Sequence, residues 1–311
     1  MKWSWKKSIM WLFLFVFFSL SGAFLLQNGD TLEQVEQIPL FITGYLAVIV
    51  IAGLFLNGIF LLRIARPFGI HIPYAFLLSC ATSLVNMVTP LRGGAFFRAW
   101  YLNRTLGMKY KDFTISLFGN YLIVFLVSSL TALSLLFCTE IKKQEFILPL
   151  FFIFGALFLG CISILIFPKP ISKHSLLSNK WNNIVKGWNC IRSSPLLIFQ
   201  LILLSFGNLV LEAMGILCIL SALNVPIHFL SALFLSAFLV VGIFINITPG
   251  SLGISESLVV FAGILLGINP QIMLLGTLIR RAIGIVVLLL LGIPAKLFLL
   301  HISTASEKQL I

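Results

Sequence analysis

Charge is scarce in this chain, and negative charge is the scarcer sign. Only 10% of the 311 residues are charged and 60% are hydrophobic, with nine Asp and Glu against 21 Lys and Arg and a net charge of +12. A water-soluble fold of this length needs a more polar surface, so the composition excludes one and indicates a polytopic membrane protein. The basic residues lie in short loops between apolar runs, which points to membrane topology and not to a nucleic-acid partner.

Motifs for metal binding and catalysis are missing as well. The five cysteines are scattered without a CxxC pair, and the four histidines are isolated near loops, so we expect no metal site. The chain has no Walker or dinucleotide-binding glycine fingerprint and no nucleophile–base arrangement, and we expect no cofactor. These absences make an enzyme the less favoured interpretation without excluding one.

Long apolar runs dominate what is present. Six have the length of a membrane span and cover about 9–26, 39–62, 113–138, 147–167, 196–223 and 271–300. The first is long for a signal peptide and no A-x-A cleavage site follows it, so we expect an uncleaved span. With both termini cytoplasmic, the cytoplasmic loops and tails hold 15 Lys and Arg and the outer loops hold two. This bias predicts a multi-pass protein of the cell (inner) membrane in that orientation.

Two further apolar segments, 72–103 and 228–267, are interrupted by a Thr-Pro pair and glycines. The interrupting residues are Thr89, Pro90, Gly93 and Gly94 in the first segment, and Thr248, Pro249, Gly250 and Gly253 in the second. The flanking charges place both ends of each segment on the same side of the membrane. We therefore expect two re-entrant hairpins, the first entering from the cytoplasmic side and the second from the outer side. Non-helical backbone at this depth must be surrounded by protein or a water-filled cavity.

The interrupted segments divide the chain into similar halves. The Thr-Pro pairs lie 159 residues apart, and the same offset carries span 39–62 onto 198–221 and span 113–138 onto 272–297. Each half contains three crossings, so the second copy must be inverted. We predict one all-α membrane domain over 1–311, with about six transmembrane helices and two re-entrant hairpins in a 3+3 inverted repeat.

Within that domain, the first repeat covers about 1–140 and the second about 147–300. The basic, Trp-containing stretch 168–195 is predicted to be a cytoplasmic interfacial segment, and 301–311 a polar tail.

Charges inside apolar segments are the candidates for function, because each costs about 2.5–3.5 kcal/mol at a helix centre on insertion scales. Arg92 and Arg98 in the first hairpin could bind a phosphate, with the backbone amides of Gly93 and Gly94 beside them. Alternatively, Arg98 reaches the cytoplasmic interface and Arg92 pairs with an acid.

Acidic residues define the other candidate positions. Glu256 is expected to pair with Arg280 or Arg281, either as a structural ion pair or as a gate. Ser205, Asn208 and Glu212 share one helix face, which either forms interhelical hydrogen bonds or lines a cavity. Four arginines face two glutamates in these segments, and this positive surplus suits an anionic ligand such as a lipid phosphate.

The two interrupted motifs also carry a family resemblance. Residues 86–99 (NMVTPLRGGAFFRA) and 248–257 (TPGSLGISES), with Leu266-Gly267-Ile268 and Arg280, resemble the flippase-like membrane proteins related to the transmembrane domain of lysylphosphatidylglycerol synthases. The first motif of that family has an acid where this chain has Ala95, so a role for that acid does not carry over. The resemblance implies handling of an aminoacylated phospholipid or a polyprenyl-linked, hopanoid or similar lipid. It does not imply lysyl transfer, because we expect no soluble transferase domain in a chain ending at Ile311.

We therefore predict a lipid transporter or flippase that moves an amphipathic, anionic lipid between leaflets, with membrane lipids as its ligands. The predicted substrate-binding residues are Arg92, Gly93, Gly94, Arg98, Ser205, Asn208 and Glu212, and the predicted gate is Glu256 with Arg280 or Arg281. Two alternatives remain open: a membrane-embedded transferase acting on a lipid-linked substrate, and a non-catalytic membrane subunit that partners a lipid-modifying enzyme.

Overall fold

The computed structural model describes residues 38–308, apart from 66–67, 90–91, 140, 243–247 and all of 167–193 except 182, 185 and 189. Every regular element in these described ranges is a helix, which confirms the all-α prediction. The predicted first span at 9–26, most of the predicted interfacial segment at 168–195, and Pro90 lie outside the described residues.

Within the described part of the chain, five helices are long and apolar enough to cross a membrane. They are α3 (Leu40–Ala65), α6 (Tyr110–Leu136), α7 (Ile147–Ile166, preceded by the short η3 at Gln144–Phe146), α9 (Pro195–Ala222) and α12 (Pro270–Lys308). These helices have large apolar side chains on their outer faces, including Phe41, Phe152 and Leu290. Helices that are apolar all round are typical of a membrane-embedded bundle.

Four shorter helices form two pairs, which lie in the two interrupted segments. The first helix pair is α4 (Ile72–Val88) with α5 (Gly93–Leu106), and the second is α10 (Phe229–Val241) with α11 (Ile254–Leu265), preceded by η4 (Pro249–Ser251). The residue before each proline is extended: Thr89 has φ −110° and ψ 139°, and Thr248 has φ −86° and ψ 151°. A proline disfavours helical geometry in the preceding residue, which agrees with the end of α4 at Val88, just before the first Thr-Pro pair. In the second segment α10 already ends at Val241, and the extended Thr248 lies just before η4.

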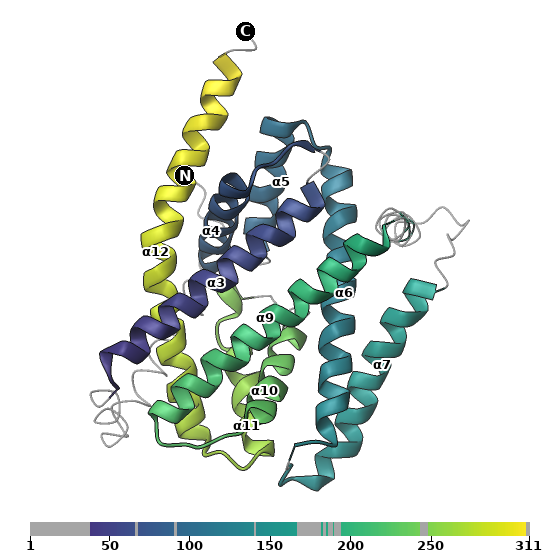
Figure 1. Cartoon of the computed structure of the whole chain (residues 1–311), viewed down its shortest axis with the longest axis vertical. Coiled ribbons are helices and arrows are strands. Elements are labelled where there is room, and N and C mark those ends of the chain that lie inside the picture. The colour runs from purple at the N-terminus through teal and green to yellow at the C-terminus, as the bar shows by residue number, and fades with distance from the viewer. Residues whose placement is uncertain are drawn as a thin grey trace, which may run out of the picture.

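The two helix pairs lie towards opposite ends of the bundle, with α4 and α5 in the upper part and α10 and α11 in the lower part of Figure 1. Their inner ends meet, because η4 packs against α4. A Cβ built on Gly250 would lie 3.4 Å from Cα of Met87, near the end of α4. Gly250 has φ +57°, a conformation that glycine adopts without strain, so it can make this close approach.

Packing holds each pair between longer helices. The first pair packs through α4 against α12 and α3, and the second through α10 against α9 and α6. Gly292 lets α12 approach α4 closely: a Cβ there would lie 2.9 Å from Cβ of Leu84 and 3.1 Å from the Cys80 carbonyl oxygen. Small residues at such crossings are how apolar helices gain close contact in a membrane.

Candidate functional site

Glu256 stands in the first turn of α11 and is 4% exposed. Its Oε2 accepts a hydrogen bond of 2.8 Å from the backbone N–H of Gly253, the N-cap residue just before the helix. A glutamate three residues after the N-cap satisfies an N–H that has no partner within the helix, and it also suits the positive end of the helix dipole. Local sequence thus places this carboxylate at the inner end of the second helix pair.

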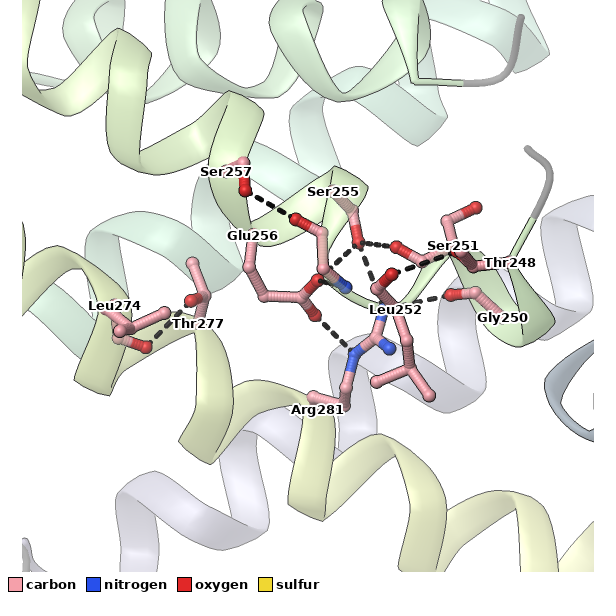
Figure 2. Close-up of polar contacts among 11 residues, drawn as sticks. Thr248, Gly250, Ser251, Leu252, Ser255, Glu256, Ser257, Leu274, Thr277 and Arg281 are labelled. Atoms are coloured by element: carbon pink, nitrogen blue, oxygen red, sulfur yellow. Dashed lines mark hydrogen bonds and ion pairs between the residues drawn. The ribbon is translucent and has the colours of Figure 1, made fainter. Parts of the chain in front are cut away.

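Arg281 of α12 closes the site around that carboxylate, as Figure 2 shows. Its Nε lies 2.6 Å from Glu256 Oε1, and its Nη2 donates to the Gly250 carbonyl oxygen at 2.9 Å and to Ser255 Oγ at 3.0 Å. The Ser255 hydroxyl has one proton, which can go to the Ser251 carbonyl oxygen (3.0 Å) or to Glu256 Oε2 (3.1 Å). One guanidinium therefore ties η4 and the start of α11 to α12.

Arg280, the neighbouring residue, reaches a different helix. Its Nη2 donates to Oε2 of Glu212 on α9. The sequence left Arg280 and Arg281 as alternative partners of Glu256; the structure pairs Arg281 with Glu256 and Arg280 with Glu212. Both glutamates of the apolar segments are thus paired with arginines of α12.

The first helix pair holds the other two arginines. Arg92 adopts φ +55° just before α5, and its Nη1 donates to the Tyr121 hydroxyl of α6 at 2.5 Å. The Arg92 guanidinium also lies 5.2 Å from the centroid of the Tyr121 ring, within cation–π range. Arg92 therefore has a phenol among its partners, which the sequence analysis did not suggest.

Arg98 lies one and a half turns along α5 and is half-buried. Its Nε donates to Thr82 Oγ1 of α4 at 3.3 Å. The backbone N–H of Gly94 donates to Asn86 Oδ1 at 2.9 Å, so this predicted anion-binding amide is bonded within the protein. A Cβ on Gly94 would lie 2.6 Å from Asn86 Oδ1 and nearer still to the Thr82 carbonyl oxygen, which explains a glycine where α4 and α5 touch. Thr82 and Asn86 thus place a polar seam between the two helices.

The remaining predicted site residues lie along α9. Ser205 is 4% exposed and donates to the Leu201 carbonyl oxygen of its own helix at 2.8 Å. Asn208 is half-buried, and Glu212 is exposed. Their role in lining a substrate path stays a prediction.

Sequence reasoning did not single out Thr82, Tyr121 or Ser255 as site residues. Ser255 was within the second motif, and its position beside Glu256 was the available signal. Thr82 lies one helical turn before Asn86 on the same face of α4, which was also readable. Nothing in the sequence distinguished Tyr121 from the other aromatic residues, which make up 13% of the chain.

A separate cavity of about 200 Å³ lies at the outer end of the first helix pair. It is lined by the start of α4, the end of α5 and Ile302 of α12, with Tyr74 and Tyr101 among its polar side chains. None of the predicted substrate-binding residues line it. Among the described residues, no cluster of His, Cys, Asp or Glu is arranged to hold a metal ion.

Comparison with known proteins identifies the family. The model of the lysylphosphatidylglycerol synthase transmembrane region matches residues 11–292. The chain therefore belongs to this family, and with its apolar helices it is a multi-pass membrane protein. No curated protein and no solved structure matched the chain.

Proposed function

We propose that this protein moves an amphipathic, anionic lipid between the leaflets of the cell membrane. Membership of the lysylphosphatidylglycerol synthase transmembrane family supports a lipid-related function. The observation that carries the proposal is the meeting of two interrupted helix pairs at their inner ends, with arginines on the first and an ion-paired glutamate on the second. Interrupted helices that meet inside a bundle are the usual place for a transporter's substrate.

In this proposal the helix pairs are re-entrant hairpins in an inverted repeat. The 159-residue offset supports the repeat: it carries α5 (93–106) onto 252–265, where α11 runs from Ile254 to Leu265, and it carries the start of α6 onto 269, next to the start of α12 at Pro270. The bias of basic residues supports cytoplasmic termini, with the first hairpin open to the cytoplasm and the second to the outside.

The arginines of the first pair supply the charge for a lipid phosphate. Arg98 is held in the seam between α4 and α5 by a neutral hydroxyl, and Arg92 is held by a phenol. For Arg98, the neutral hydroxyl positions the guanidinium while leaving its charge to attract an anion. Bidentate hydrogen bonding then gives guanidinium its preference for phosphate.

The second pair supplies the gate. Arg281 bonds the backbone of Gly250, the residue that lies against Met87 of α4. The Glu256–Arg281 pair therefore holds the inner end of the second pair against the first. We propose that the ends must separate for a head group to pass, and that this cluster sets the closed position.

Reconstitution in liposomes tests the function. The probe is phosphatidylglycerol that carries, on an acyl chain, a fluorophore that dithionite reduces from outside. In liposomes with the wild-type protein we expect dithionite to bleach the inner-leaflet probe as well, whereas protein-free liposomes protect it. An Arg92→Ala, Glu256→Ala double variant, with its folding checked by thermal unfolding, is expected to lose this activity. Equal rates for wild type and folded double variant would contradict the proposal.

A further inference from the structure

The two consecutive arginines of α12 pair with glutamates of very different burial. Arg281 and Glu256 have side chains that are 21% and 5% exposed, and Arg281 also bonds Gly250 and Ser255. Arg280 has a side chain that is 18% exposed, but its partner Glu212 is 49% exposed. The two arginines are thus about equally exposed, and the difference lies in the glutamates: Glu256 is enclosed by protein, whereas Glu212 can be reached from outside the protein.

The exposure of Glu212 is unusual for its place on α9. Residues three, four and seven positions away share its helix face. Of these, Ser205 and Leu209 are 4% exposed, Ile216 is 1% and Ile219 is 2%. Glu212 therefore lies on the packed face of α9, not on its lipid-facing side. The packing on that face is interrupted at Glu212, whose side chain is exposed. The half-buried Asn208 is one turn away on the same face.

The guanidinium of Arg280 lies close to the backbone of α9 at this opening. A Cβ built on Gly215 would lie 3.1 Å from both Nε and Nη2 of Arg280. Glycine at this position lets the guanidinium sit flat beside the helix next to Glu212. The carboxylate of Glu212 can be reached by molecules outside the protein. Another anion can therefore replace it as the partner of the Arg280 guanidinium.

We infer that Arg280 is an anion-binding site for a phosphate group, and that Glu212 is the internal anion which the ligand displaces. This assignment separates Arg280 from the gate, in which Arg281 is the partner of Glu256. It rests on the proposed lipid translocation for its ligand, the phosphate of a membrane lipid, and adds a second position for that phosphate besides Arg92 and Arg98. Guanidinium is suited to this exchange because it binds carboxylate and phosphate in the same bidentate geometry.

The test is a binding titration that does not depend on transport. Purified protein in detergent would be titrated with dioleoylphosphatidylglycerol, with dioleoylglycerol as the lipid without phosphate, and with inorganic phosphate, and each complex would be counted by native mass spectrometry. We expect Glu212→Gln to bind phosphatidylglycerol roughly threefold to tenfold more tightly than wild type, because a competing ion pair has been removed. Arg280→Gln is expected to bind it about tenfold more weakly, with Arg280→Lys between the two.

Lys296→Gln is the matched control, since it removes a positive charge from the same helix away from the site, and we expect wild-type affinity. A tighter Glu212→Gln variant is not a result that misfolding produces, so the experiment remains decisive if Arg280→Gln is unstable. Unchanged affinity in Glu212→Gln or equal weakening in Lys296→Gln would overturn the inference. So would binding of inorganic phosphate that depends on Arg280 when the binding of phosphatidylglycerol does not. If the wild-type protein scrambles lipid but Glu212→Gln does not bind phosphatidylglycerol more tightly, only this inference fails. If Glu212→Gln binds more tightly but the protein does not scramble lipid, only the proposed function fails.

Discussion

Replacing Glu256 by glutamine is expected to lower the free energy of unfolding by about 3 kcal/mol, because it leaves the half-buried Arg281 guanidinium without its counter-charge. Glutamine keeps an oxygen for the Gly253 N–H, so the start of α11 is retained and the loss reports the ion pair. Equilibrium unfolding by SDS in mixed micelles, followed by circular dichroism, measures the difference.

Two comparisons make that result specific. Glu145→Gln removes an exposed carboxylate in η3 and is expected to change stability by less than about 0.5 kcal/mol. The double variant Glu256→Gln, Arg281→Met removes both charges and is expected to regain most of the lost stability, because a buried ion pair can be replaced by uncharged groups at little net cost. Wild-type stability in Glu256→Gln alone would show that the pair does not hold the second helix pair in place.

Arg98→Ala is expected to slow labelled-lipid scrambling by roughly 10- to 100-fold. The reason is the loss of one charged donor at the seam between α4 and α5, and hydrogen bonds to charged groups contribute about 1.5–3 kcal/mol. Arg98→Lys keeps the charge but loses the planar fork, so an intermediate rate is expected. The measurement is the dithionite assay in liposomes with matched amounts of reconstituted protein.

The control for Arg98 lies on the same helix. Arg104 is exposed near the end of α5, and its guanidinium stacks over Trp100 at 5.5 Å from the ring centroid. Arg104→Ala removes the same charge outside the seam and is expected to scramble lipid at the wild-type rate. Equal slowing in both variants would assign the effect to net charge, and an unaffected Arg98→Ala variant would remove Arg98 from the proposed path.

Sequence patterns predicted the long helices well because the membrane imposes their length. The apolar run at 39–62 became α3 at Leu40–Ala65, and the run at 196–223 became α9 at Pro195–Ala222. Breaks were predicted at the two Thr-Pro pairs, since proline acts through local sterics alone. The last helix is longer than its apolar run of 271–300 and reaches Lys308, because the polar residues after 300 include no helix breaker.

Pairing of charges was harder to predict because it depends on packing. Consecutive residues on a helix point about 100° apart, so Arg280 and Arg281 had to face different neighbours. Only the placement of α9 and α11 around α12 decides which glutamate each one meets. Within the second interrupted segment, local signals fix where the helix resumes: α11 begins at Ile254, because Gly253 and Glu256 together satisfy the start of the helix.

The central claim is that the two helix pairs enter the membrane from opposite faces. Single cysteines in a cysteine-free background at His71 and Lys109 mark the outer ends of the first pair, and those at His228 and Gln271 mark the outer ends of the second; all four positions are exposed. We expect a membrane-impermeant maleimide to label positions 71 and 109 only from the cytoplasmic side, and 228 and 271 only from the outside. Labelling of the two ends of one pair from opposite sides would contradict the account.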